Sequence, residues 1–281
     1  MADIIDGKLI SAAEREKIAE ETAVLKEKGV TPGLAVIIVG DDPASKVYVR
    51  NKHRACEAVG FNSVVIEMPA DTTESALVSK VKELACDSTI DGILVQLPLP
   101  KHIDEKKVIE AIPASKDVDA FNLENVGRIM TGDFRFLPCT PAGIMKMLEY
   151  KNISVAGKEC VVVGRSNIVG KPMAILLLAA NGTVTVCHSQ TTDLSSVTRR
   201  ADILVAAVGK PSFIKADMVK EGAVVIDVGI NRMRDGHLCG DVDFEAVSKK
   251  ASAITPVPGG VGPMTITMLL RNTLESAKKR K

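Results

Sequence analysis

The fold of this chain is indicated first by the segment Val161-Val162-Val163-Gly164-Arg165-Ser166-Asn167-Ile168-Val169-Gly170-Lys171-Pro172-Met173. Its β-branched start predicts a buried strand, Gly164 permits a tight turn, and the apolar run that begins at Met173 continues at helical length. Such a turn presents backbone N–H groups and the positive end of a helix dipole, which suits a pyrophosphate. The match to G-x-G-x-x-G is partial, because Ser166 replaces the second glycine and Gly170 comes one residue late. By itself the segment also fits an ordinary βα turn.

Strands and helical segments alternate around this segment. Strands are predicted over residues 160–163, 183–187, 203–207 and 223–228, and the alternation implies a parallel sheet. Dinucleotide-binding folds usually carry an acid near the end of the second strand, where it binds the adenosine ribose. Here that position reads Cys187-His188-Ser189-Gln190, and Arg165 lies in the turn itself. We therefore expect a 2′-phosphate, and hence NADP; the alternatives are a surface arginine and a histidine satisfied at a strand end.

The first half of the chain also predicts an α/β arrangement. Ser11 and Glu14 form a capping box at the start of a helix that continues to Lys28. Further segments follow in alternation: strands over 34–39 and 62–68, helices over 44–59 and 71–86, and a strand from Ile93.

Two side chains of this half are candidates for chemistry. Tyr48 and Lys52 are four residues apart on a predicted helix and share a face, although such a pair is commonly a surface contact with a solvated ammonium. Gln96 is a lone amide at the end of a buried strand, followed by two prolines. It either satisfies a loop backbone or points from the carboxyl end of a parallel strand toward a ligand, and the sequence leaves both open.

Two irregular segments complete the set of candidates. In the loop that contains Asp117 and Asp119, a carboxylate could accept two parallel hydrogen bonds from a planar N–C–N donor pair, such as the pyrimidine edge of a pterin. The segment from Thr255 to Thr265 combines rigid prolines with permissive glycines, which indicates a loop shaped for close approach of the backbone to a ligand.

Composition excludes several classes of protein. The 281 residues suggest two domains, and 36 basic against 35 acidic side chains give no electrostatic case for nucleic-acid binding. Aromatic content of 3% without Trp argues against base-stacking platforms. The six cysteines form no C-x-x-C pair and the four histidines lack ligand spacing, so we expect no metal site. With no apolar run of membrane-spanning length, we expect a cytoplasmic protein without membrane contact.

Six stretches, in order, resemble motifs of the bifunctional methylenetetrahydrofolate dehydrogenase/methenyltetrahydrofolate cyclohydrolase family. The resemblance covers nearly the whole chain, and it is very specific because all six stretches occur in the order of that family. The chain departs from the family pattern at Ala120, where glycine is common. The stretches are Tyr48 with Lys52, Val95-Gln96-Leu97-Pro98-Leu99-Pro100, Asp117-Val118-Asp119, Gly164-Arg165-Ser166 with Val169-Gly170-Lys171-Pro172, Cys187-His188-Ser189, and Pro258-Gly259-Gly260-Val261-Gly262-Pro263-Met264-Thr265.

The resemblance implies a two-domain α/β fold. Residues 1–138 with 264–281 would form a folate-binding catalytic domain to which the C-terminal helix returns, and residues 139–263 a Rossmann-type NADP-binding domain, with a folate cleft between them. It also implies a cytoplasmic homodimer, in contact through the Rossmann domain, that serves one-carbon metabolism and purine biosynthesis.

The implied activity is oxidation of 5,10-methylenetetrahydrofolate to 5,10-methenyltetrahydrofolate with NADP, followed by hydrolysis to 10-formyltetrahydrofolate. Lys52 would be the general base and acid, oriented by Gln96, while Tyr48 packs on the folate. Two rivals stay open: an NADP-dependent dehydrogenase of another small substrate, of the shikimate type, and a non-enzymatic NADP-binding sensor. The implied substrate-binding residues are Tyr48, Asp119, Pro258, Gly259 and Gly262. The implied cofactor-binding residues are Gly164, Arg165, Ser166, Gly170, His188, Ser189 and Ile230.

Overall fold

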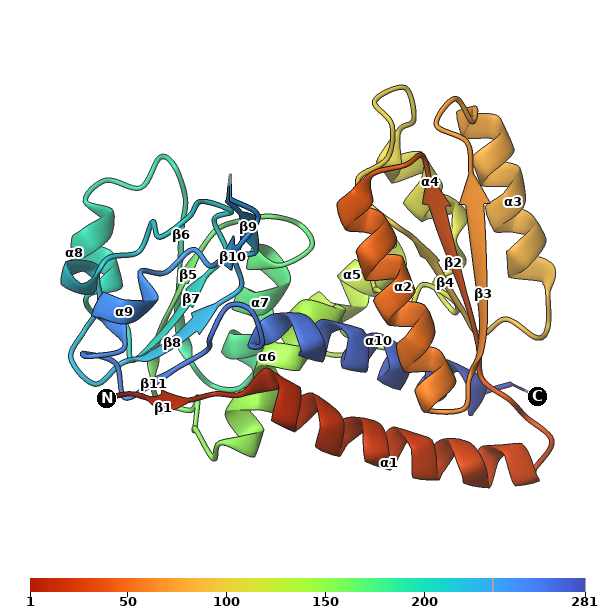
Figure 1. Ribbon diagram of the computed structural model, residues 1–281. Helices are drawn as coiled ribbons and strands as arrows, with labels where there is room; N and C mark the ends of the chain where they lie inside the picture. Colours follow the sequence, from red (N-terminus) through yellow and green to blue (C-terminus); the bar gives the residue numbers. More distant parts are fainter. Residues whose placement is uncertain (234, 281) are drawn as a thin grey trace. The chain divides into compact units, whose positions relative to one another are not determined.

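The computed structural model describes residues 1–233 and 235–280 (Figure 1). It forms two compact units, which we call unit 1 (Met1–Ala12 and Thr140–Thr265) and unit 2 (Ala13–Cys139 and Ile266–Lys281). The boundaries expected from sequence differ at the N-terminus, because they place residues 1–12 with the first domain. In the structure these residues belong to unit 1, since strand β1 (Asp3–Ile4) pairs in parallel with β11 (Ala253–Ile254). Lys281, at the end of the predicted first domain, lies outside the described residues.

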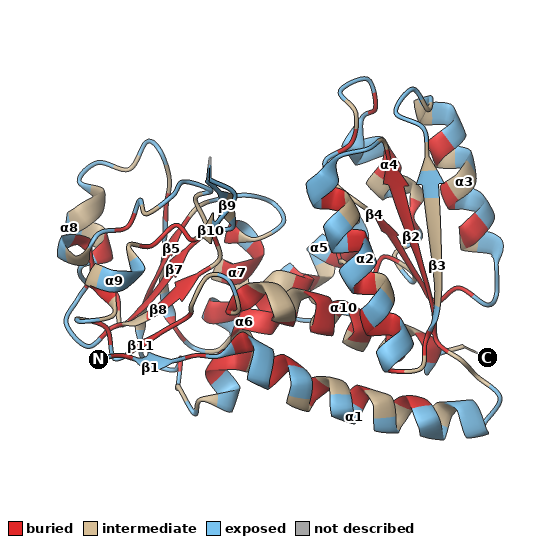
Figure 2. Cartoon of the chain, viewed as in Figure 1, coloured by how far each residue is buried: buried red, intermediate tan, exposed pale blue. Residues whose placement is uncertain are grey.

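Unit 1 is built on a parallel six-stranded sheet in the order β1-β11-β8-β7-β5-β6. Strand β5 lies between β6 and β7, so the chain reverses its direction across the sheet at β5, and ligands of such sheets bind at this point beside the carboxyl ends of the strands. The central strands β5, β7 and β8 are apolar and buried, as Figure 2 shows, because helical segments cover both faces of a parallel sheet. The other elements in order are α6 (Cys139–Tyr150), β5 (Glu159–Val163), α7 (Gly170–Ala179), β6 (Thr183–Cys187), α8 (Leu194–Thr198), β7 (Ile203–Ala206), η1 (Ala216–Met218), β8 (Val224–Asp227), β9 (Asn231–Arg232), β10 (Leu238–Cys239) and α9 (Phe244–Val247).

Unit 2 contains a parallel three-stranded sheet in the order β3-β2-β4. On β2, Ala35, Ile37 and Val39 pack with Leu77 and Val81 of α3 in one core cluster. Helix α2 contacts β2 and β3, and Figure 1 shows it alongside this sheet. The elements are α1 (Gly7–Glu27, of which residues 13–27 belong to this unit), β2 (Gly33–Val39), α2 (Pro43–Ala58), β3 (Asn62–Met68), α3 (Glu74–Cys86), β4 (Gly92–Val95), α4 (Glu105–Ala111), α5 (Leu123–Thr131) and the main part of α10 (Val261–Ala277).

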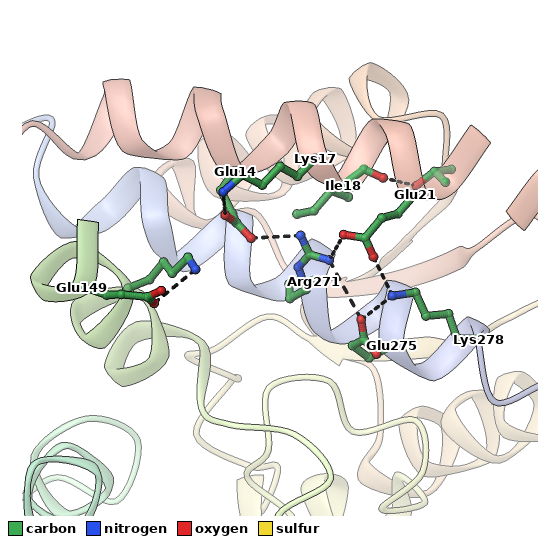
Figure 3. A network of polar contacts seen from close by, with 10 residues as sticks. Glu14, Lys17, Ile18, Glu21, Glu149, Arg271, Glu275 and Lys278 are labelled. Atoms are coloured by element: carbon green, nitrogen blue, oxygen red, sulfur yellow. Dashed lines mark hydrogen bonds and ion pairs between the residues drawn. The ribbon is translucent and has the colours of Figure 1, made fainter. Parts of the chain in front are cut away.

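The C-terminal helix α10 is tied to α1 within unit 2 by an ion-pair network around Arg271 (Figure 3). Its guanidinium donates to Glu14 at 2.9 Å and to Glu21 at 2.6 Å, and Lys278 adds a contact of 2.6 Å to Glu21. The Arg271 side chain is mostly buried. Charge-assisted bonds of this kind join segments some 250 residues apart, and therefore fix how α10 lies along α1.

The predicted capping box at Ser11 is wrong about where α1 begins. The helix begins at Gly7, and the side chain of Asp6 accepts hydrogen bonds from the backbone of Lys8 at 2.8 Å and of Leu9 at 3.2 Å. Asp is a strong N-cap residue, and here it precedes the pattern that suggested Ser11. Glu14, the other half of the expected box, pairs with Arg271.

Candidate active site

Lys52 lies on α2, and the helix starts where its sequence provides a cap. The Asp42 side chain accepts from Ser45 N at 2.8 Å, and Pro43 occupies the first turn, where its missing N–H costs nothing. Lys52 is only 9% exposed, so the interpretation of a solvated surface ammonium is wrong. Tyr48, one turn earlier, is 36% exposed.

Gln96 provides the main polar partner of Lys52. It follows β4, and its backbone N–H donates to Ile37 O of β2 at 2.8 Å, which extends the sheet by one residue. Its Oε1 accepts from Lys52 Nζ at 3.0 Å, and its Nε2 donates to Leu97 O at 2.7 Å. The amide therefore satisfies a loop carbonyl, the first of the two interpretations left open by the sequence, and also holds the lysine, while the interpretation that it faces a ligand stays a prediction.

The environment of Lys52 favours its neutral form. Burial lowers the pKa of the ammonium below its ordinary value, because desolvation disfavours the charged state. The negative charge of the nearby Asp119 carboxylate opposes this and raises the pKa, but the net direction is downward. A lowered pKa makes the ammonium a better proton donor and brings the neutral amine within easier reach, as general acid and base catalysis requires.

The loop that carries Asp119 is shaped by Asp117. The Asp117 carboxylate is buried and accepts from Asn122 N at 2.8 Å and from Asn125 Nδ2 at 2.8 Å. Burial raises its pKa to about 6. Between these residues Ala120 is fully buried with φ 58°, in the left-handed region that glycine adopts most easily. The departure from glycine at this position therefore stores backbone strain beside Asp119.

Two residues near this loop were not among the predicted site residues. Cys139 is buried, and its pKa lies well above the ordinary value because of burial and then of the Asp119 charge, so the thiol is neutral. Asn272 of α10 donates to Val118 O at 2.8 Å and to Leu137 O at 2.9 Å. A buried amide in an apolar helix was the available signal for Asn272, but its partners are more than 130 residues away in the sequence.

In unit 1, the turn after β5 has the close packing that a nucleotide turn requires. Gly164 has φ 131°, and a Cβ added there would lie 2.1 Å from Ala207 O. A Cβ on Gly170 would lie 2.2 Å from Gly164 O, so Gly170 permits helix α7 to approach the turn although it comes one residue late. Ser166 Oγ accepts from Val169 N at 3.2 Å and from Gly170 N at 3.3 Å, which leaves the first turn of α7 partly capped by the loop itself.

The segment after β6 lies next to this turn, because Gly164 N donates to Cys187 O at 2.9 Å. Arg165 and Ser189 are exposed, and His188 is half-buried. Within the described chain, no ion pair engages Arg165. His188 Nδ1 accepts from Gln190 N at 3.2 Å, as expected of a histidine satisfied at a strand end.

The remaining predicted residues follow β8 and β11. Ile230 is 46% exposed and lies next to Gly262, where an added Cβ would approach only its Cδ1, at 3.6 Å. Pro258 is exposed. Gly259 has φ 104° and its carbonyl accepts from Lys8 N at 3.2 Å. Part of the proline-glycine loop therefore packs against the start of α1. The loop expected as far as Thr265 is wrong about its end, because α10 begins at Val261, and Gly262 lies in the first turn of this helix with an open side.

Among residues 1–233 and 235–280, no group of His, Cys, Asp and Glu side chains is placed to hold a metal ion, and the expectation of no metal stays a prediction. Over the same residues, no helix has the length and apolar character needed to cross a bilayer.

Comparison with known families decides the assignment. Residues 5–119 match the family profile described as tetrahydrofolate dehydrogenase/cyclohydrolase, catalytic domain, and residues 138–281 match the NAD(P)-binding domain of the same family. The chain belongs to the tetrahydrofolate dehydrogenase/cyclohydrolase family. The predicted resemblance, the two-domain α/β fold class and the assignment to an enzyme family are thereby confirmed.

Relatives in this family match along their full length. The bifunctional protein FolD of Acidovorax sp. (strain JS42) is 61% identical over 99% of both chains. The crystal structure of the FolD methylenetetrahydrofolate dehydrogenase/cyclohydrolase from Campylobacter jejuni is 51% identical, covers 100% of both chains and superposes with a TM-score of 0.98. The Trypanosoma brucei methylenetetrahydrofolate dehydrogenase-cyclohydrolase, complexed with NADP cofactor and inhibitor, is 40% identical over 99% of this chain and 98% of its own, with a TM-score of 0.95.

The shikimate-type rival shares only the fold. Shikimate 5-dehydrogenase from Thermus thermophilus superposes with a TM-score of 0.54 at 15% identity, over 88% of this chain and 100% of its own. This explains why the order of the elements alone did not exclude that rival.

Proposed function

We propose that this protein oxidises 5,10-methylenetetrahydrofolate to 5,10-methenyltetrahydrofolate with NADP and hydrolyses the product to 10-formyltetrahydrofolate. The observation that carries the proposal is the buried Lys52, held at 3.0 Å by Gln96 in the part of the chain that matches the family's catalytic domain. The family supplies the reaction class, and this pair supplies a group able to move a proton.

Hydrolysis needs proton transfer, and Lys52 is suited to it. Its pKa is lowered by burial, and a cationic methenyl substrate would lower it further. The neutral amine takes a proton from the attacking water and returns it as the ring opens. Gln96 Oε1 accepts from Nζ and so orients the lysine, whereas Tyr48, one turn away on α2, packs on the folate.

The dehydrogenase step depends mainly on orientation. Asp119 accepts hydrogen bonds from the pterin edge, in a loop kept in shape by Asp117. The turn from Gly164 to Gly170 lets a pyrophosphate approach the backbone, and its close glycine packing fits a dinucleotide. When bound, NADP supplies the hydride acceptor. Pro258 and Gly259 lie in the loop before α10 and Gly262 in its first turn, a segment that would approach folate or nicotinamide, and Ile230 contacts Gly262.

We assign the 2′-phosphate to Arg165 and Ser189, which lie on segments joined by the Gly164 to Cys187 hydrogen bond. The Trypanosoma brucei relative was crystallised with NADP, in agreement with this choice. Arg165→Ala should therefore weaken NADP use more than NAD use. Equal loss with both cofactors, or no change in the preference between them, would remove Arg165 from this role.

The direct test mixes purified protein with 5,10-methylenetetrahydrofolate and either NADP or NAD, and follows reduced cofactor and methenyl product by their separate absorbances. Reduced cofactor without accumulating methenyl product supports both activities. Methenyl product that accumulates and then disappears only at its uncatalysed rate would leave a dehydrogenase alone. Cofactor binding without any folate turnover would favour the sensor.

A matched pair of variants tests the lysine. Lys52→Met should abolish hydrolysis of supplied methenyltetrahydrofolate, because the thioether of methionine can neither accept nor return the proton of the attacking water. Lys46→Met, on the same helix but partly exposed and paired with Asp41 at 2.6 Å, should keep it. Asp119→Asn should weaken both folate reactions. Full hydrolysis by Lys52→Met would rule out the lysine mechanism.

We also propose a cytoplasmic homodimer that supplies one-carbon units for purine biosynthesis. All six cysteines are free, which suits a reducing compartment. In unit 1 the edge strand β6 exposes Val186, which offers a surface for contact through the Rossmann domain. Light scattering at two concentrations tests the dimer, and a monomer at both would contradict it.

A further inference from the structure

Two buried carboxylates, Asp227 and Asp241, lie at the carboxyl edge of the unit 1 sheet. Asp227 is the last residue of β8 and is 3% exposed, and Asp241 follows β10 and is fully buried. Neither has a lysine or arginine partner within the described residues, where the ion pairs of unit 1 use other acids. Their charges are met by backbone and amide N–H groups instead.

The Asp241 carboxylate fills a concavity formed by three successive backbone N–H groups. Consecutive N–H groups that converge in this way make an anion-binding nest. The internal carboxylate of Asp241 occupies this nest, and it therefore holds the loop after β7 in one conformation. The donors are Val208 N at 2.6 Å, Gly209 N at 2.8 Å, Lys210 N at 2.9 Å and, from β9, Asn231 Nδ2 at 2.9 Å.

Asp227 extends the network to two further loops. Its carboxylate accepts from Gly229 N at 3.0 Å, Asp241 N at 2.9 Å and Val242 N at 2.9 Å. Its own backbone N–H donates to Thr255 Oγ1 at 2.7 Å. The Asp227 carboxylate therefore holds the segment after β8, and the backbone of the same residue holds the segment after β11.

The packing around the pair leaves no room for side chains. A Cβ added to Gly229 would lie 2.2 Å from Asp241 Oδ1, and one added to Gly240 would lie 1.8 Å from Asp227 Oδ2. Both glycines are needed to let the backbone reach the carboxylates. The network is consequently a closed arrangement, in which the two acids and two glycines depend on one another.

The loops held in this way border the nucleotide turn. The loop after β7 begins at Ala207, whose carbonyl touches the position of a Cβ on Gly164. The loop after β8 carries Ile230 directly after Gly229, and Ile230 approaches Gly262. The nucleotide turn after β5 and the loops after β7 and β8 all follow strands at the edge where parallel sheets bind ligands.

We propose that Asp241, supported by Asp227, is a positioning residue for NADP, which sets the loop at 207–210 and the segment at 229–231 in the conformation that receives the nicotinamide half of the cofactor. This inference rests on the proposed function for the identity of the cofactor. In the contacts described above, the carboxylates of the two acids meet only backbone and amide N–H groups. They therefore act on the cofactor through the loops that they hold.

The test is Asp241→Asn, which keeps the shape of the side chain but leaves one oxygen for four donors. We expect the dissociation constant of NADPH, measured by titration of its fluorescence, and the KM for NADP to rise about tenfold, the size expected from loss of hydrogen bonds to a charged acceptor. Hydrolysis of supplied methenyltetrahydrofolate, which needs no nucleotide, should stay within about twofold of wild type. A purely structural role would lower both activities together.

Asp243→Asn is the matched control. Asp243 lies two residues further, is partly exposed and pairs with Lys215 at 3.1 Å, so its loss should leave the NADPH affinity unchanged. If Asp241→Asn does not fold, Asn231→Ala removes a single donor and should raise the KM for NADP two- to threefold.

Three results would overturn the inference: unchanged NADPH affinity in a folded Asp241→Asn, an equal fall of both activities, or an equal effect of Asp243→Asn. The titration with NADPH does not depend on folate turnover. A wild-type protein that binds NADPH without turnover would therefore defeat the proposed function, while the effect of Asp241→Asn on affinity still decides this proposal.

Discussion

Lys52 Nζ lies 3.0 Å from Gln96 Oε1, so the proton state of a buried lysine depends on a neutral neighbour. Gln96→Glu would place a negative charge at this distance and raise the pKa of Lys52. We expect hydrolysis near neutral pH to fall at least tenfold, and its pH profile to shift to higher pH, with dehydrogenase activity retained. Asn51→Asp, an exposed change on the same helix, should leave the profile in place. An unshifted profile in Gln96→Glu would contradict the role of the pair.

Ala120→Gly should stabilise the protein. The left-handed conformation at φ 58° costs an L-residue about 1–2 kcal/mol, and the greater freedom of glycine in the unfolded chain offsets part of the gain. We expect a net increase of up to about 1 kcal/mol in the free energy of unfolding, measured in urea. Ala23→Gly, in the exposed interior of α1, should destabilise by about 1 kcal/mol. Similar losses at both positions would show that Ala120 is not strained.

Arg280→Ala should destabilise unit 2. The guanidinium donates to Asp91 Oδ1 at 2.9 Å and also pairs with Oδ2, and Asp91 is 5% exposed. Removing the arginine leaves a buried carboxylate whose other contact is Gly33 N at 2.8 Å, a loss of about 3–5 kcal/mol. Thermal unfolding measures it, with Lys279→Ala, on an exposed side chain, as the control. Adding Asp91→Asn to Arg280→Ala should recover part of the stability, and failure to do so would indicate that packing, not charge, dominates.

Asp117 should make stability depend on pH. Its pKa is raised from 3.8 to about 6 by burial, so the native state binds a proton that the unfolded chain has released. The stabilisation is fully present below pH 3.8 and is lost as the pH rises through about 6. Between pH 4 and 7, the free energy of unfolding of wild type should therefore fall by about 2 kcal/mol relative to that of Asp117→Asn, as followed by urea unfolding.

The same variant has a suitable partner. Asn125 Nδ2 donates to Ala114 O at 3.0 Å and to Asp117 Oδ2 at 2.8 Å, so without turning over it can donate to the amide oxygen introduced at position 117. Asp133→Asn, at an exposed side chain, should give no such difference in pH dependence. If the difference in free energy of unfolding between Asp117→Asn and wild type stays constant from about pH 4 to 7, the pKa of Asp117 is not raised by folding.

Local patterns predicted most of the secondary structure. The expected strands at 62–68 and 183–187 coincide with β3 and β6, because β-branched runs bounded by turn residues depend little on distant contacts. The turn at Gly164 and the family motifs are local in the same sense. The start of α1 was missed because Asp6 and Ser11 both fit a cap, and local sequence does not decide between them.

Sequence alone determined that the chain is a two-part α/β protein with a strand, a glycine turn and a helix at residues 161–173, and it offered Tyr48, Lys52 and Gln96 as candidate residues. Only the tertiary structure decided that Lys52 is buried, that residues 1–12 join the sheet of unit 1, and that Asp227 and Asp241 hold three loops. The physical reason is distance along the chain. Burial and hydrogen bonding of these groups depend on segments tens to hundreds of residues away, whose approach is set by packing of the whole unit and not by any local pattern.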